Sequence, residues 1–203
     1  MFEKIFNKLK LTRTPEVVFL IGLPGSGKSS YIKKQFDNER HFRKYAVCST
    51  DYYIETMAAI KGKKYHEIFE EFYPEAEKNF FEHIDVAVKN NVSIFIDRTN
   101  VSASDRKMVL DKIPSHYIKR AVVFHLPQDE LKKRLLHRAE TTGKVITDEV
   151  LERIIAKYEH PTYQEFDKIK LGIEKLMKEL SAKLDISRFD GYSADARYPA
   201  WFA

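Results

Sequence analysis

Residues 22–29, Gly-Leu-Pro-Gly-Ser-Gly-Lys-Ser, have the composition and spacing of a phosphate-binding loop, G-x-x-x-x-G-K-[ST]. Glycines let the backbone curl so that successive N–H groups face a phosphate, and the dipole of the following helix favours an anion there. The Lys28 amino group can reach the outer phosphates of a nucleotide, and the Ser29 hydroxyl can ligate Mg²⁺. The motif predicts a nucleoside triphosphate site formed by Gly22, Gly25, Ser26, Gly27, Lys28, Ser29 and Ser30.

Two aspartates, Asp51 and Asp97, each come close behind a short apolar run. The carboxyl ends of parallel strands meet at one edge of a sheet, which is where such sheets bind ligands. At that edge Asp97 would orient hydrated Mg²⁺ together with Ser29, unless it only caps the next turn. Asp51 would accept the proton of an acceptor hydroxyl as a general base. The alternative for Asp51 is to cap the helix expected from Tyr52, and the two roles are compatible.

Two arginines, Arg134 and Arg138, are four residues apart and share one face of the helix expected after residue 127. Residues 138–147 are polar and contain Gly143, so they are interpreted as a lid. An inward-pointing Arg138 would neutralise charge on a transferring phosphoryl group, and Arg134 would assist in nucleotide binding. Solvated basic side chains are the alternative, and that alternative is favoured for Lys144 in the same segment.

The alternation of strand and helix patterns predicts an α/β fold with a central parallel sheet of about four strands, flanked by helices and carrying the helical lid. The first strand is expected to lead directly into the phosphate-binding loop, and a helix is expected to continue from Ser30. The strands are expected at residues 16–22, 45–49, 92–96 and 118–126.

Helical periodicity follows the second and third strands. Residues 65–87 carry apolar side chains every three or four positions, and Pro74 is expected to divide them by starting a second helix. Ser102 or Ser104 would cap the next helix. Beyond residue 147 two more helices are expected, separated near His160, and the second would pack on the domain through Phe166, Ile169, Ile173, Leu176, Leu180 and Leu184.

The composition is that of a single globular α/β domain: 203 residues, 43% hydrophobic and 32% charged. We expect one domain over 1–203, with an N-terminal amphipathic segment at 1–14, the lid at 138–147 and a C-terminal aromatic tail at 186–203. The single Cys48 excludes an intramolecular disulfide and a cysteine-based zinc site, and its apolar surroundings predict a buried, inert thiol. No apolar run approaches the roughly 20 residues of a membrane span, and we expect a cytoplasmic protein.

The net charge of +5 permits a polyanionic partner without requiring one. Basic strings at residues 40–44 and 61–64 are candidates for contact with nucleic acid phosphates, although solvated faces are the favoured interpretation. The seven histidines show no metal-ligand spacing, and the oligomeric state is open.

Taken together, the loop at 22–29, Ser49-Thr50-Asp51, Asp97-Arg98-Thr99-Asn100 and the lid arginines resemble the P-loop kinase domain of phage-type polynucleotide 5′-hydroxyl kinases. The similarity covers about residues 17–167. The resemblance implies that Asp51 is the general base, that Thr99 and Asn100 bind the acceptor side, and that Arg138 contacts the nucleotide phosphates.

Two departures concern the acceptor. The family commonly has an arginine just before the base and another three residues after it, and here these positions hold Thr50 and Ile54. No D-x-D-G-T phosphatase signature follows, so no fused 3′-phosphatase is expected. The expectation is an ATP- and Mg²⁺-dependent kinase acting on the 5′-hydroxyl of DNA or RNA. The alternatives are a kinase of a nucleoside, a nucleotide or a hydroxymethylated DNA base, or an NTP-binding regulatory or toxin-like module.

Overall fold

The computed structural model describes residues 14–38 and 45–172. These residues belong to one compact unit that ends at Gly172. The expected N-terminal segment up to residue 13, the basic string at 40–44 and the aromatic tail at 186–203 lie outside the described residues.

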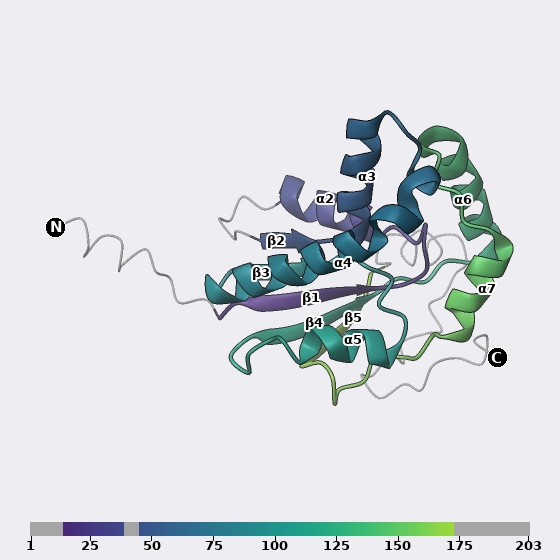
Figure 1. Cartoon of the computed structure of the whole chain (residues 1–203). Helices are drawn as coiled ribbons and strands as arrows, with labels where there is room; N and C mark the ends of the chain where they lie inside the picture. Colours follow the sequence, from purple (N-terminus) through teal and green to yellow (C-terminus); the bar gives the residue numbers. More distant parts are fainter. Residues whose placement is uncertain (1–13, 39–44, 173–203) are drawn as a thin grey trace, which may run out of the picture. The chain divides into compact units, whose positions relative to one another are not determined.

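The core of the fold is a five-stranded, all-parallel sheet in the order β2-β3-β1-β4-β5 (Figure 1). The central strand β1 is buried along its whole length, as expected for a parallel strand with both faces covered. Because all five strands are parallel, their carboxyl ends lie at the same edge of the sheet. The strands are β1 (Glu16–Ile21), β2 (Tyr45–Cys48), β3 (Ser93–Ile96), β4 (Ile118–Val123) and β5 (Lys168–Leu171).

Six helices connect the strands within the described residues: α2 (Lys28–Asn38), α3 (Thr50–Lys61), α4 (Tyr65–Lys89), α5 (Ala103–Leu110), α6 (Gln128–Thr142) and α7 (Asp148–Ala156). In Figure 1, α6 and α7 lie beyond the carboxyl end of β1, on the side to which the strand points. The predicted α/β class with a parallel sheet flanked by helices is confirmed. In the part of the chain described, no helix combines the length and the apolar character needed to cross a membrane.

Helix α4 corrects one prediction, because Pro74 lies inside an unbroken helix and does not divide it. A proline in a helix interior costs roughly 3 kcal/mol, through a lost hydrogen bond and a steric clash. Burial along α4 offsets that cost on both sides of the proline. Before it, Ile68 and Phe72 pack with Ile54 of α3, and after it Phe80 joins the core under the sheet.

Strand β5 corrects a second prediction, because residues 168–171 form a strand where a helix was expected. The strand pairs in parallel with β4, with Ala121 opposite Ile169. The sequence Lys-Ile-Lys-Leu alternates with the period of a strand. Phe166, just before it, is buried with its ring centroid 5.2 Å from that of Phe19. The remainder of the expected helix, from Ile173 onward, lies outside the described residues.

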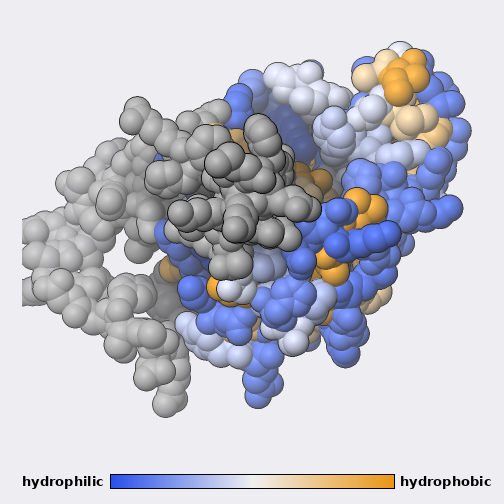
Figure 2. All heavy atoms as spheres, turned by 90° about the vertical axis from the view of Figure 1, so that its left-hand side faces the viewer, coloured by the Kyte–Doolittle hydropathy of each residue, from blue (hydrophilic) through white to orange (hydrophobic). Residues whose placement is uncertain are grey.

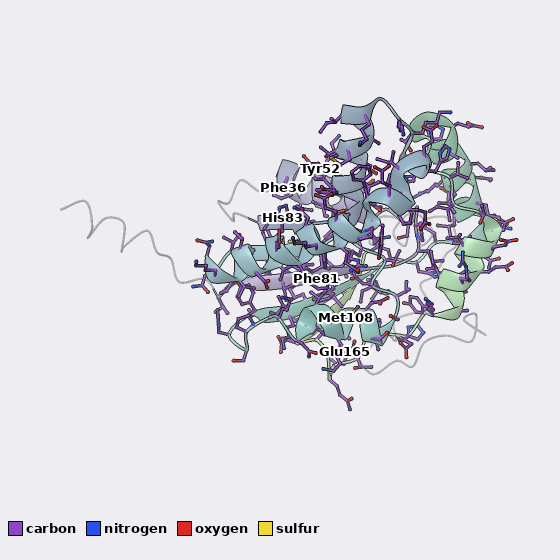
Figure 3. The ribbon with its side chains drawn as sticks, viewed as in Figure 1. Phe36, Tyr52, Phe81, His83, Met108 and Glu165 are labelled. Atoms are coloured by element: carbon purple, nitrogen blue, oxygen red, sulfur yellow. The ribbon has the colours of Figure 1, made fainter. Side chains whose placement is uncertain are left out.

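Hydrophilic side chains predominate on the face seen in Figure 2. Large exposed apolar residues are distributed over helices, strands and loops; Figure 3 shows Phe36 on α2, Tyr52 on α3 and Met108 on α5, while Val47 and Leu171 lie on strands. By contrast, Cys48 is fully buried, and burial raises the pKa of its thiol to about 12. The predicted burial of this thiol is confirmed, and its raised pKa is consistent with the predicted low reactivity.

Candidate active site

The loop between β1 and α2 has a backbone that requires its glycines. Gly25 and Gly27 have φ angles of 81° and 101°, a region that side chains with a Cβ rarely adopt. At Gly22 a Cβ would lie 2.7 Å from the carbonyl oxygen of Phe124 and 2.8 Å from Ser26 Oγ. The spacing of glycines in the motif is thus dictated by the local fold of the loop.

Lys28 begins α2 with its side chain folded over this loop. Its Nζ donates hydrogen bonds to the carbonyl oxygens of Gly22 and Leu23, each at 2.9 Å. Burial lowers the pKa of Lys28 to about 8, and the negative charges of Asp97 and Asp51 only partly counteract it. The amino group therefore gains charge stabilisation from any anion bound in the loop.

Ser29 and Asp97 are brought together from α2 and the end of β3. The Ser29 hydroxyl donates to Asp97 Oδ2 at 3.1 Å, and burial raises the pKa of Asp97. A hydroxyl beside a carboxylate is a donor set that suits Mg²⁺, which keeps several waters and phosphate oxygens as its other ligands. The described residues contain no group of three or more histidine, cysteine or acidic side chains for a metal.

Ser26 supports the fit of the loop to a phosphate. Its Oγ is buried and has no hydrogen-bond partner among residues 14–38 and 45–172. An unsatisfied buried hydroxyl is uncommon and calls for an explanation. A phosphate oxygen accepting from this hydroxyl would supply one. Ser30, also predicted to bind nucleotide, lies exposed in the first turn of α2.

Asp51 lies in the first turn of α3 but does not cap it. The cap is Ser49, whose Oγ accepts from the backbone N–H of Tyr52 at 3.3 Å, so the capping alternative for Asp51 is wrong. Asp51 Oδ1 accepts from the Tyr65 hydroxyl at 2.7 Å, and Oδ2 accepts from the Lys144 ammonium. Burial alone raises the pKa of Asp51, but these hydrogen bonds and the nearby positive charges outweigh it and hold the pKa below its usual range.

Lys144 is a site residue that sequence reasoning undervalued. It follows Gly143, the left-handed C-cap of α6, and its side chain is only 6% exposed. The ammonium reaches Glu55 Oε1 at 3.4 Å and lies 4.2 Å from the ring centroid of Tyr65. The Gly143 carbonyl lies 3.0 Å from His66 Nδ1. No sequence signal marks these contacts, because they join the end of α6 to α3 and α4.

Both predicted arginines lie on α6, which continues through residue 142 into the segment expected to be a lid. Arg138 donates to Glu55 Oε1 at 3.5 Å. Arg134 pairs with Glu130 at 2.8 Å, and its Nη1 lies 3.9 Å from the position of a Cβ on Gly27. The helix therefore carries Arg134 to the phosphate-binding loop and Arg138 to the Asp51 side of the site.

Thr99 and Asn100 connect the end of β3 to the phosphate-binding loop. The Thr99 carbonyl accepts from the Gly22 N–H at 3.0 Å. Asn100 is buried with a φ of 51°, and its Nδ2 donates to the carbonyl oxygens of Leu20 at 2.8 Å and Ile96 at 3.2 Å. The side-chain nitrogen is thus committed to joining β1 and β3, and contact with an acceptor stays a prediction for these two residues.

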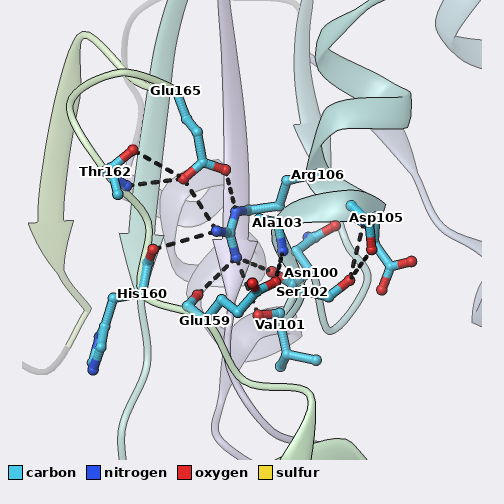
Figure 4. A network of polar contacts seen from close by, with 11 residues as sticks. Asn100, Val101, Ser102, Ala103, Asp105, Arg106, Glu159, His160, Thr162 and Glu165 are labelled. Atoms are coloured by element: carbon cyan, nitrogen blue, oxygen red, sulfur yellow. Dashed lines mark hydrogen bonds and ion pairs between the residues drawn. The ribbon is translucent and has the colours of Figure 1, made fainter.

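A buried arginine donates hydrogen bonds to backbone carbonyl oxygens of this segment (Figure 4). Arg106, fully buried on α5, pairs with Glu165 through Nε at 2.7 Å and Nη2 at 3.1 Å. Its Nη1 donates to the carbonyl oxygens of Asn100 and Val101 at 3.1 Å and of Glu159 at 2.9 Å. Sequence reasoning missed this network, because an arginine in a short helix usually faces solvent.

Comparison with known proteins gives a family. The model of the AAA domain family AAA_33 matches residues 17–161, well over half of the chain. Heterogeneous nuclear ribonucleoprotein U-like protein 2 of Homo sapiens is 28% identical over 72% of this chain, and its counterpart in Mus musculus is 27% identical over the same share. The chain spans 20% of the length of each of these relatives.

Solved structures share the fold. A chain of the Pnkp1/Rnl/Hen1 RNA repair complex is 25% identical with a TM-score of 0.58, over 74% of this chain and 46% of that one. A putative kinase from Chloroflexus aurantiacus has a TM-score of 0.60 at 14% identity, over 87% of this chain and 98% of that one. The parallel sheet, the phosphate-binding loop and the extent of the family match lead to one conclusion: the chain belongs to the AAA domain family AAA_33, with a P-loop kinase-like fold.

Proposed function

We propose that this protein is an ATP-dependent kinase that transfers the γ-phosphate to a hydroxyl, with the 5′-hydroxyl of DNA or RNA as the acceptor. The observation that carries the proposal is the position of Asp51. Asp51 follows β2, whose carboxyl end is joined to that of β3 because the Asp97 N–H donates to the Cys48 carbonyl at 2.9 Å, and the charge of Asp51 raises the pKa of both Lys28 and Asp97. A proton acceptor close to a phosphate-binding lysine is what hydroxyl phosphorylation requires.

On the nucleotide side, backbone N–H groups of the loop and the Lys28 ammonium hold the phosphates. Ser29 and Asp97 are the residues that would hold Mg²⁺, and Mg²⁺ bound there would neutralise charge on the β- and γ-phosphates. Arg134 lies beside the loop, and Arg138 would stabilise charge on the transferring group.

On the acceptor side, Asp51 takes the proton of the attacking hydroxyl. The Tyr65 hydroxyl, bonded to Oδ1 at 2.7 Å, orients the carboxylate, and Oδ2, which the Lys144 ammonium contacts in this structure, is the oxygen that would accept the proton. Because Ser49 caps α3, the sequence does not need a carboxylate at position 51 for the helix itself. That independence supports a chemical role for Asp51.

The choice of a polynucleotide acceptor is supported by the 25% identity to a chain of an RNA repair complex. Thr50 and Ile54 are 7% and 0% exposed, so neither position offers a charged contact to an acceptor phosphate. That observation favours a second candidate, a small-molecule hydroxyl acceptor.

The test uses the purified full chain, γ-labelled ATP·Mg²⁺ and a panel of acceptors. The panel contains a 5′-hydroxyl DNA oligonucleotide, its RNA counterpart, a nucleoside 3′-monophosphate, a free nucleoside and gluconate. We expect label on the oligonucleotides, with an apparent KM that rises with salt because bound phosphates release counterions. Equal labelling of the free nucleoside without a salt effect would select the small-molecule candidate. Absence of label on every acceptor would overturn the kinase proposal.

A further inference from the structure

Both oxygens of the Asp51 carboxylate are engaged before any substrate is considered. Oδ1 accepts from the Tyr65 hydroxyl at 2.7 Å, and Oδ2 accepts from the Lys144 ammonium. An ammonium on Oδ2 occupies the direction from which an acceptor hydroxyl would donate, and its charge reduces the basicity of the carboxylate. In this arrangement Oδ2 of the proposed general base is paired with Lys144 of the segment 138–147, although the Asp51 side chain as a whole is 46% exposed.

The ammonium of Lys144 is held from three sides. Besides Asp51, it contacts Glu55 Oε1 at 3.4 Å and lies over the ring of Tyr65 at 4.2 Å. With its side chain only 6% exposed, Lys144 has little contact with water, and these partners supply the contacts of its ammonium. If the Asp51 contact is lost, Glu55 is the carboxylate that remains, and a second anion would take the place of Asp51.

A bound nucleotide would bring such a partner. Helix α6, which ends just before Lys144, carries Arg134 beside the phosphate-binding loop, with Nη1 3.9 Å from the position of a Cβ on Gly27, and Lys144 shares Glu55 with Arg138 of the same helix. Lys144 also follows Gly143, a left-handed cap at the end of α6, where a helix gives way to a loop. A short displacement of this loop would carry the ammonium from the base towards the phosphates.

We propose that Lys144 is a positioning residue that exchanges partners, an inference that rests on the kinase function proposed above. Before nucleotide binds, Lys144 covers Asp51 Oδ2. In the nucleotide complex its ammonium pairs with the terminal phosphate, and Oδ2 becomes free to accept the proton of the acceptor hydroxyl. Lys144 keeps all its protons throughout, so it makes and breaks only ionic contacts.

A double-mutant cycle on nucleotide affinity tests the exchange without relying on catalysis. The dissociation constant of a non-hydrolysable ATP analogue with Mg²⁺ is measured by calorimetry for the unmodified protein, Asp51→Asn, Lys144→Met and the double variant. If Asp51 and the nucleotide compete for one ammonium, Asp51→Asn tightens nucleotide binding at least about threefold, and this gain disappears in the Lys144→Met background.

The cycle separates exchange from simple electrostatics. Removing a negative charge near the phosphates would tighten binding by the same factor in both backgrounds, and that result would overturn the proposal. Lys133→Met changes an exposed lysine on α6, the helix that precedes Lys144; it is the matched control and should leave the Asp51→Asn effect intact. Lys144→Gln repeats the cycle should the methionine variant fold poorly.

The same samples separate failure of the exchange from failure of the kinase function. If the unmodified protein transfers labelled phosphate, and Asp51→Asn has the same effect on nucleotide affinity in both backgrounds, then the exchange is refuted and the kinase function is supported. If Asp51→Asn tightens nucleotide binding only when Lys144 is present, and no acceptor is labelled, then the kinase function is refuted, but Asp51 and the nucleotide still compete for Lys144.

Discussion

Asp51→Asn is the sharpest test of the chemistry, because the substitution preserves shape and removes the ability to take a proton. General-base catalysis typically contributes about 10²–10⁴-fold, which corresponds to roughly 2.7–5.4 kcal/mol of activation free energy. We therefore expect the rate of phosphoryl transfer at saturating ATP and acceptor to fall within that range. Single-turnover transfer of labelled phosphate to an oligonucleotide measures this rate directly.

The fold should tolerate the change. Ser49 remains to cap α3, and the amide oxygen of asparagine can still accept from Tyr65. The lost ion pair joins a carboxylate that is 46% exposed to the nearly buried Lys144, which keeps Glu55 as an anionic partner at 3.4 Å, so the cost in stability is about 1 kcal/mol. In a domain of this size that loss lowers the melting temperature by about 2–4 °C.

Glu55→Gln provides the matched control. Glu55 contacts Lys144, as Asp51 does, and also Arg138, but the proposed mechanism gives it no proton to accept. Its substitution should reduce transfer by less than about tenfold. The general-base role of Asp51 is refuted if Asp51→Asn leaves the transfer rate within tenfold of that of the unmodified protein, or if Asp51→Asn and Glu55→Gln reduce the rate equally.

Three further predictions concern charge and stability. Because the pKa of Lys28 is lowered to about 8, its charge is lost as pH rises through that value, and kcat/KM for ATP should fall above about pH 8. The decrease of kcat should occur at higher pH, because bound phosphate stabilises the ammonium. A decrease of kcat and of kcat/KM at the same pH would contradict this. Arg138→Ala should lower kcat about 10²-fold or more with little change in ATP affinity, and an unchanged kcat would assign Arg138 to the solvated surface. Arg106→Met should lower the free energy of unfolding, measured with denaturant, by about 3–5 kcal/mol, because Glu165 and several carbonyl groups lose their partner. Substitution of the neighbouring residue, Lys107→Met, breaks an exposed pair and should lower it by less than about 1 kcal/mol. Equal losses in the two variants would refute the role of the network.

Features encoded by consecutive residues were predictable from the sequence. The phosphate-binding loop follows from glycines at positions with positive φ, and β1 from an apolar run buried on both faces. Ser102, one of two predicted caps, accepts from the backbone N–H of Asp105 and begins α5. Each of these depends on interactions within a few residues, which the order of amino acids specifies directly.

Local rules failed where distant contacts outweigh them. Pro74 remains inside α4 because the helix is buried against α3 on one side of the proline and in the core of the sheet on the other. Residues 168–171 form a strand because the edge of β4 offers them backbone hydrogen bonds. Propensity sets a small free-energy preference, and burial or sheet pairing exceeds it.

The phosphate-binding loop, the two carboxylates and the two arginines are recognisable from residue type and spacing, so the order of amino acids already points to phosphoryl chemistry. The tertiary structure alone decided how these groups are partnered. Lys144 meets Asp51 across 93 residues of chain, Arg106 meets Glu165 across 59, and Asn100 meets Leu20 across 80. A lysine or an arginine has the same local pattern whether it faces water or a buried carboxylate, and only packing of the elements that carry them distinguishes the two.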